Sequence, residues 1–273
     1  MTSSPSFRAA TSAVAVATMM GLAACTPVEA TTPQGSSPQG PLYVSVGDSY
    51  STGLGGGVSD PARCHHSSTS FPGLLGKKRG WNTTQVACPG AITWTMTGTQ
   101  LHALSNKTDR VTITIGGNDV LLSTGNVPCA GNEAFCKEKR LAGQRYAKGA
   151  FVNSIRMAYR AVQNAAPKAK IAVVGYPRIF GPDTSCLTPA VTLSSRGAKE
   201  ANLLTSTINE VLQEQAASVG FTFVSVEKVF AGHGTCTSSP FILGHDPAHP
   251  EAILHPTRAG QSAYAKAVAA QWK

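Results

Sequence analysis

The chain has 273 residues, with 23 lysine or arginine residues against 14 aspartate or glutamate residues, and its formal net charge is +9 at pH 7. The basic residues are scattered. Their only clusters, Lys77–Arg79 and Lys137–Arg140, contain none of the aromatic side chains that interleave in a nucleic-acid groove. The composition therefore argues against nucleic acid as a partner, and attraction to an anionic envelope surface is the milder inference.

Residues 1–24 are typical of an export signal. Their apolar run, Ala13–Ala24, is too short for a helix that spans a membrane, and it leads into Leu-Ala-Ala-Cys, which resembles a bacterial lipobox ending at Cys25. This pattern predicts a cell-envelope lipoprotein, lipidated on Cys25 and held on the outer face of the membrane by that anchor. The alternative is ordinary cleavage near Val28–Ala30, which would release a secreted protein.

A tether and one domain follow the signal. Residues 25–40 are rich in Thr, Pro, Ser, Gln and Gly and have almost no large apolar residue, so we expect a lipidated cysteine followed by a flexible tether. Residues 41–273 contain no second linker and no internal repeat. A segment of about 230 residues can bury a substantial core, and we expect it to form a single α/β domain.

Apolar runs of strand length alternate with helical patterns along this domain. Strands that alternate with helices predict a parallel sheet covered on both faces. We expect strands at Leu42–Val46, Gln85–Ala87 (the weakest run), Val111–Ile115, Ile171–Val174 and Phe221–Val226, and loops at Gly53–Ser70 and Leu121–Leu141. We expect helices from Ala147 to Val162, from Ala201 to Leu212, and at the end of the chain, where Thr257 would be the cap and Ala263, Ala267 and Ala270 the apolar stripe.

The cysteine count favours disulfides. Once Cys25 is set aside for lipid, six cysteines remain, an even number that suits an exported protein. Six cysteines allow fifteen pairings, and the residues alone do not choose among them, although Cys129 and Cys136 are close enough in sequence to close a local loop. The chain has no Cys-x-x-Cys motif, so a zinc ribbon or a thioredoxin-like site has little support.

Ser49 is a candidate catalytic nucleophile. It follows the first expected strand in the sequence Gly47-Asp48-Ser49, at the place where open α/β sheets carry their sites. Gly, Asp and Ser are also common in turns, so this segment alone fits an ordinary turn equally well. It is not the G-x-S-x-G elbow of α/β-hydrolases, because Ser51 stands where that motif needs glycine.

Three later segments would meet Ser49 at the same edge of the sheet, although each alone also fits a structural role. Gly90 has no side chain, so its backbone N–H can approach an oxyanion closely. Asn118 can point its amide N–H groups at developing negative charge. His255 is a candidate base, because the ordinary pKa of a histidine lies near neutral pH and its ring can accept the proton of a serine.

A metal site is not predicted. His245 and His249 have an H-x-x-x-H spacing, but Pro247 lies between them and disfavours the helix that would bring both rings to one ion. Nothing else in the sequence asks for a metal or an organic cofactor.

The segments at Ser49, Gly90, Asn118 and His255 occur in the order and approximate spacing of the SGNH, or GDSL, hydrolase superfamily, which the chain resembles from Leu42 to Lys273. It is most similar to the secreted actinobacterial lipases and esterases that have three disulfides. The resemblance implies a flavodoxin-like three-layer α/β/α sandwich with strand order 2-1-3-4-5. It also implies the disulfides Cys64–Cys88, Cys129–Cys136 and Cys186–Cys236.

The resemblance also assigns the site. It implies that Ser49 is the nucleophile and His255 the general base and acid. The oxyanion hole would consist of the backbone N–H groups of Ser49 and Gly90 and the side chain of Asn118. Physically this set is sound, because a neutral serine needs a base and the tetrahedral intermediate needs donors that are already in place.

One position departs from the family pattern. The family usually has an acid three residues before the histidine, where this chain has Ala252. Either a backbone carbonyl, most simply that of Ala252, orients His255 in a Ser-His dyad, or the side chain of Glu251 does so. We favour the dyad, because a shift of one residue in an extended segment turns a side chain to the opposite face.

The sequence therefore predicts an exported serine esterase or lipase that acts on an acyl ester of a lipid or of an acylated glycan. The alternative is a catalytically weak or inactive envelope lipoprotein that binds acyl or glycan ligands in the same cleft. The missing acid at Ala252 keeps this alternative open.

Overall fold

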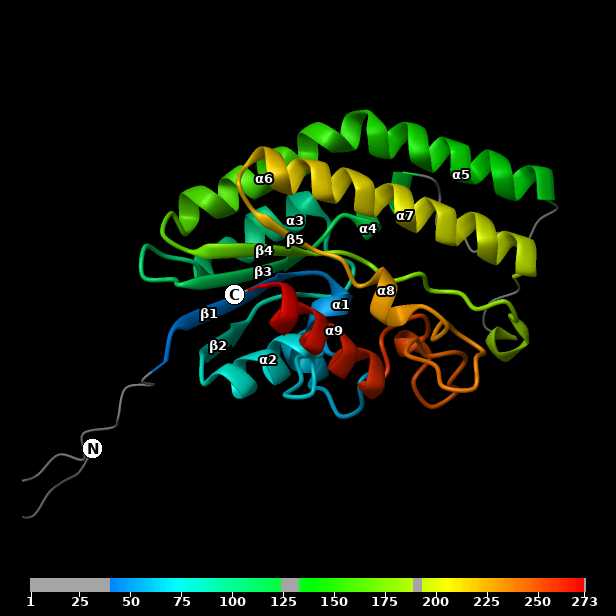
Figure 1. Ribbon diagram of the computed structural model, residues 1–273, viewed down its shortest axis with the longest axis horizontal. Coiled ribbons are helices and arrows are strands. Elements are labelled where there is room, and N and C mark those ends of the chain that lie inside the picture. The colour runs from blue at the N-terminus through cyan, green and yellow to red at the C-terminus, as the bar shows by residue number, and fades with distance from the viewer. Residues whose placement is uncertain (1–39, 124–132, 189–192, 273) are drawn as a thin grey trace, which may run out of the picture. The chain divides into compact units, whose positions relative to one another are not determined.

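A parallel sheet of five strands forms the middle of the domain in the computed structural model, which describes residues 40–123, 133–188 and 193–272 (Figure 1). The strand order is β2-β1-β3-β4-β5, as expected, and this order places β1 between β2 and β3. The strands are β1 Leu42–Gly47, β2 Asn82–Gln85, β3 Arg110–Thr114, β4 Lys170–Val174 and β5 Thr222–Val224.

The inner strands are buried on both faces, which explains why the sequence identifies them well. Val44 pairs with Val111 and Val46 with Ile113, and all four side chains are buried. Continuous β-branched runs of this kind are typical of strands covered on both sides.

The edge strand β2 begins three residues before its predicted start. It begins at Asn82 and pairs with β1 up to Gln85, whereas the prediction began at Gln85. Its residues are partly exposed, because an edge strand needs β-branched residues such as Thr83 and Thr84 more than it needs an apolar run. The apolar pair Val86–Ala87 therefore marks the end of this strand.

Helices cover both faces of the sheet (Figure 1). On one face lie α3 Thr93–Thr99, α4 Gly117–Ser123, α5 Glu133–Lys148, α6 Ala150–Ala165 and α7 Ser195–Ser218; on the other lie α1 Ser49–Thr52, α2 Phe71–Arg79, α8 Glu227–Phe230 and α9 Arg258–Gln271. Short 3₁₀ turns occur at Pro61–Arg63, Leu101–Ala103, Ser185–Leu187 and Pro250–Ala252. The expected three-layer α/β/α sandwich is confirmed.

One loop prediction and one helix prediction need correction. The expected loop Leu121–Leu141 is wrong at both ends, because α4 continues to Ser123 and α5 begins at Glu133. The helix expected from Ala147 to Val162 spans a break, since Ala147 belongs to α5 and Val162 belongs to α6. Gly149 separates the two helices with non-helical backbone angles.

The last helix begins where the sequence predicts it. The side chain of Thr257 accepts a hydrogen bond from the backbone N–H of Gly260 and caps α9. Ala263 and Ala267 of the predicted stripe are buried, together with the larger Tyr264 and Val268, whereas Ala270 is exposed.

Among the described residues, the structure contains the disulfides Cys64–Cys88 and Cys186–Cys236, as the family resemblance implied. Cys25 and Cys129 lie outside the described residues, so lipidation and the Cys129–Cys136 pair stay predictions. The domain boundaries proposed within residues 1–39 also lie outside them. Within the described part of the chain, no helix is long and apolar enough to cross a membrane.

Candidate functional site

Ser49 stands at the end of β1, on the first turn of α1. Gly47 allows the sharp turn between β1 and Ser49. Its φ of +131° favours glycine, and an added Cβ would lie 2.1 Å from the carbonyl oxygen of Thr114. Ser49 is buried, and its hydroxyl lies 2.7 Å from Nε2 of His255, which is 206 residues away in sequence. The fold thus brings together the two side chains that the sequence singled out.

The hydrogen bonds of His255 define its tautomer. Nδ1 lies 2.9 Å from the carbonyl oxygen of Ile253, and because a carbonyl can only accept, Nδ1 must carry the proton. Nε2 is then free to accept the hydroxyl proton of Ser49. This is the arrangement that a general base requires.

Backbone carbonyls surround Nδ1 of His255. That of Ile253 lies within hydrogen-bond distance of Nδ1, and that of Ala252 accepts from the backbone N–H of His255 at 3.1 Å and also acts to raise the pKa of the ring. Glu251 is exposed, and its Oε1 faces Nδ1 of His249 at 3.7 Å. The geometry thus fits a backbone carbonyl better than it fits Glu251.

The surroundings of His255 favour the neutral ring. Burial lowers the pKa of His255 from its usual value, and the carbonyl of Ile253 partly offsets this effect. The imidazole is therefore unprotonated at neutral pH and ready to accept a proton.

Tyr50, the residue after Ser49, holds Leu254, the residue before His255. The hydroxyl of Tyr50 donates to the carbonyl oxygen of Leu254 at 2.8 Å. Leu254 has a φ of +64°, which is strained for a leucine, and such strain persists only where neighbouring contacts hold it. Its backbone N–H donates to Leu243, while the carbonyl of His255 accepts from the Leu243 N–H. These contacts fix the histidine against α1.

The expected oxyanion donors come from three adjacent strand ends. The N–H of Cys88 donates to the carbonyl of Gly47 at 3.0 Å, which places the turn containing Gly90 next to the end of β1. Within the described part of the chain, the N–H groups of Ser49 and Gly90 have no hydrogen-bond acceptor. The amide of Asn118, at the start of α4, donates to the carbonyl of Ala91 at 2.9 Å and keeps a second N–H for another acceptor.

A buried hydrogen-bond network links the ends of β1, β3 and β4, and the sequence did not reveal it. The hydroxyl of Tyr176 donates to the carboxyl of Asp48 and accepts from the backbone N–H of Gly117 at 3.0 Å. The other oxygen of Asp48 accepts from the N–H of Tyr50 at 3.0 Å. The Tyr176 hydroxyl therefore joins Asp48, which precedes Ser49, to Gly117, which precedes Asn118.

Burial sets the protonation of this network. It raises the pKa of Asp48 to about 7, although the hydrogen bond from Tyr176 acts in the opposite direction. It also raises the pKa of Tyr176 well above its usual value, so the phenol keeps its proton and remains a donor. A signal for Tyr176 was present in the sequence, because it lies two residues after the end of β4 at Val174, and this end lies at the same edge as the ends of β1 and β3.

The second carboxyl in the site has a structural role that was also missed. Asp119 is buried and accepts hydrogen bonds from the backbone N–H and the hydroxyl of Thr93, at the start of α3. Together with the Asn118–Ala91 hydrogen bond, this contact ties the turn that contains Gly90 to α4.

The described residues contain no group of three or more side chains that could hold a metal ion. His245 and His249, which have the H-x-x-x-H spacing, lie outside any helix. Nδ1 of His249 lies beside Glu251 instead.

A mostly apolar cavity of about 270 Å³ opens beside Ser49. Ser49, Asn118 and His255 line it, together with residues of α5 and α7 and the segments that follow β4 and precede α9. Gly90 does not line this cavity.

Residues 45–263 match the model of the GDSL-like lipase/acylhydrolase family. A lipase of Streptomyces rimosus is 35% identical over 225 residues, which cover 81% of this chain and 82% of the relative. Lipase 1 of Streptomyces coelicolor is 34% identical over 224 residues, with the same coverage.

Solved structures have the same fold. The extracellular lipase of Streptomyces rimosus has a TM-score of 0.75 at 32% identity, over 85% of this chain and 99% of that one. Phospholipase A1 of Streptomyces albidoflavus has a TM-score of 0.77 at 27% identity, with the same coverage.

The buried carboxyl of Asp48 predicts a pH-dependent cost in stability. Its pKa rises from 3.8 in the unfolded chain to about 7 in the folded one, so between these values the unfolded state releases the proton more readily. The contribution of Asp48 to stability is therefore greatest below about pH 4 and falls by up to about 4 kcal/mol as the pH rises to about 7. The variant Asp48→Asn removes this dependence.

Urea unfolding of wild type and Asp48→Asn at a series of pH values from about 4 to about 8 tests this expectation. The variant's free energy of unfolding should increase relative to that of the wild type as the pH rises. A difference that stays constant over the range would mean that Asp48 titrates at its ordinary pKa.

Proposed function

We propose a mechanism for this chain, which belongs to the GDSL-like lipase/acylhydrolase family and is a carboxylic ester hydrolase. In it, Ser49 is the nucleophile and His255 the general base and acid. The observation that carries the proposal is the 2.7 Å hydrogen bond from the Ser49 hydroxyl to Nε2 of His255, at the wall of an apolar cavity.

In the first half of the reaction, Nε2 of His255 takes the proton of Ser49 as Oγ attacks the carbonyl carbon of the ester. A bond forms between Oγ and that carbon, and the bond from carbon to the alcohol oxygen breaks. The imidazolium returns its proton to the departing alcohol oxygen. In the second half, water gives a proton to Nε2 and attacks the acyl-serine, and the carboxylic acid leaves as Ser49 regains its proton.

The negative oxygen of the tetrahedral intermediate would be held by the N–H groups of Ser49 and Gly90 and by the amide of Asn118. The unpaired N–H groups of Ser49 and Gly90 and the spare N–H of Asn118 support this assignment. Such donors contribute most when they are fixed before the reaction begins, and the network through Tyr176 holds the segments that carry Ser49 and Asn118.

The imidazolium has a neutral partner in this mechanism. The carbonyl of Ile253 holds Nδ1–H and fixes the ring orientation, but it brings no negative charge. We therefore assign a Ser-His dyad with a backbone orienter.

We infer the substrate class and the location of the protein from its relatives. The two lipases and the phospholipase A1 favour a lipid ester over an acylated glycan. The extracellular lipase of Streptomyces rimosus supports export. A lipid anchor on Cys25 rests on the sequence of residues 22–25 alone and is part of the proposal.

Labelling with a fluorophosphonate probe tests the nucleophile and separates the enzyme from an inactive ligand-binding protein. We expect the wild type to be labelled and Ser49→Ala to be unlabelled. Ser51→Ala is the matched control, because Ser51 is also buried in α1 and its hydroxyl has no hydrogen-bond partner in the described part of the chain. Loss of labelling in Ser51→Ala alone, or a folded wild type that is not labelled, would contradict the proposal.

The dyad predicts that Glu251 matters little. Its carboxylate is exposed and lies beside His249, so Glu251→Gln should change kcat/KM for a nitrophenyl ester by less than about fivefold. A loss of about a thousandfold would assign Glu251 to a triad instead.

The network predicts that Tyr176→Phe lowers kcat by about tenfold to a hundredfold with little change in KM, because Ser49 and Asn118 lose their common fixed point. The control is Tyr43→Phe, which removes a hydrogen bond to Thr112 that is also buried but does not line the cavity. Ester hydrolysis and thermal unfolding of both variants are the measurements. Equal kcat values in the two variants would show that Tyr176 contributes only to stability.

A further inference from the structure

One face of α7 lines the cavity beside Ser49. The α7 residues in the wall are spaced by three or four positions, as expected for one side of a helix. They are Gly197, Glu200, Ala201, Leu204, Thr205 and Ile208. Ile208 lies eleven positions after Gly197, which is about 16 Å along the helix axis.

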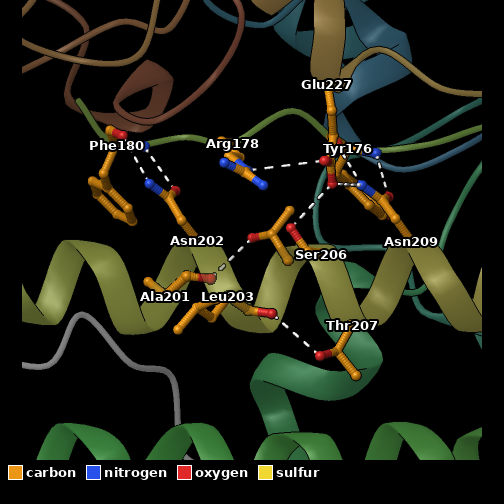
Figure 2. Close-up of polar contacts among 11 residues, drawn as sticks. Tyr176, Arg178, Phe180, Ala201, Asn202, Leu203, Ser206, Thr207, Asn209 and Glu227 are labelled. Atoms are coloured by element: carbon orange, nitrogen blue, oxygen red, sulfur yellow. Dashed lines mark hydrogen bonds and ion pairs between the residues drawn. The ribbon is translucent and has the colours of Figure 1, made fainter. Parts of the chain in front are cut away.

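Two asparagines fix the direction of this wall relative to the nucleophile (Figure 2). The side-chain amide of Asn209 pairs with the backbone N–H and carbonyl of Tyr176, at 2.8 Å each. Seven residues earlier in the helix, Asn202 pairs with the backbone N–H and carbonyl of Phe180, at 3.1 and 2.8 Å. The segment that follows β4 therefore runs along α7 in the opposite direction.

The contacts of Tyr176 identify which end of this wall lies beside Ser49. Its hydroxyl bonds to Asp48, the residue before Ser49, so the part of α7 around Ile208 lies at the level of the nucleophile. The part around Ala201 lies at the level of Phe180, seven residues or about 10 Å further along the axis.

The wall between these two levels is mostly apolar, with Thr205 as its polar residue on α7. Leu204 and Ile208 line the cavity from α7. The surrounding segments contribute Ile179, Phe180, Leu121 and Ile253. Beyond Ala201 the character changes, because Glu200 forms an ion pair there with Arg140 of α5, and both side chains are largely buried. An apolar passage that ends at a charged pair suits a hydrocarbon chain of limited length.

We propose that this passage is the acyl-chain site and that Ala201 sets the length of the chain it accepts. The inference rests on the proposed function, since the carbonyl carbon of the ester must lie at Ser49. The chain then extends along α7 from Ile208 toward Ala201, where the small methyl side chain leaves room for its distal carbons. A cavity of about 270 Å³ is at the small end of ligand pockets, so it holds one acyl chain, and the alcohol part remains outside.

The test is the kcat/KM of nitrophenyl esters from acetate to hexadecanoate, measured for the wild type, Ala201→Phe and Leu203→Phe. Ala201→Phe fills the distal part of the passage, so kcat/KM for dodecanoate and longer esters should fall at least about tenfold, while acetate and butyrate hydrolysis stays within about twofold. Leu203 is exposed on another side of the same helix, and Leu203→Phe should leave the profile unchanged.

Retained acetate hydrolysis shows that Ala201→Phe is folded. Should Ala201→Phe not fold, Ala201→Leu adds less volume and should shift the profile in the same direction by a smaller factor. An unchanged profile in the folded variant, or an equal loss for every chain length, would overturn the acyl-chain site and leave the proposed function intact. Absence of hydrolysis of every ester by the wild type would overturn the proposed function, and the acyl-chain site with it.

Discussion

The parallel pairing of β1 with β2 on one side and β3 on the other is the constraint on which the site depends. The pairing continues beyond the strands, since the N–H of Asp48 donates to Thr114 and the N–H of Cys88 donates to Gly47. The ends of three strands are therefore fixed relative to one another at the point where the strand order reverses. Open α/β sheets bind their ligands in this crevice, and here it contains Ser49 and Asn118.

The site keeps its geometry by burying polar groups that a purely apolar core would avoid. Asp48 loses its hydration and accepts only directed hydrogen bonds, and Leu254 adopts a strained backbone conformation next to the histidine. Both features reduce stability. They hold Ser49 and His255 in place from residues adjacent to each, which is the usual relation between strain and functional sites.

One side of helix α7 holds the segment after β4, and another side lines the cavity. Asn202 and Asn209 hold the irregular segment after β4 as a neighbouring strand would, with paired N–H and carbonyl contacts. Glu227 receives a further hydrogen bond from Asn209, so this side of the helix also fixes the start of α8. The cavity-facing side is mostly apolar and shapes the space beside Ser49.

The sequence by itself determined the strand order through the family resemblance, the inner strands through their β-branched runs, and the candidates Ser49, Asn118 and His255 through short motifs. These features are local, because a strand or a motif is written in consecutive residues. Tertiary structure alone decided that Tyr176 joins Asp48 to Gly117 and that the carbonyl of Ile253 lies within hydrogen-bond distance of Nδ1 of His255. It also decided which side of α7 faces the cavity, since these contacts depend on directions in space between segments distant in sequence, which residue spacing does not encode.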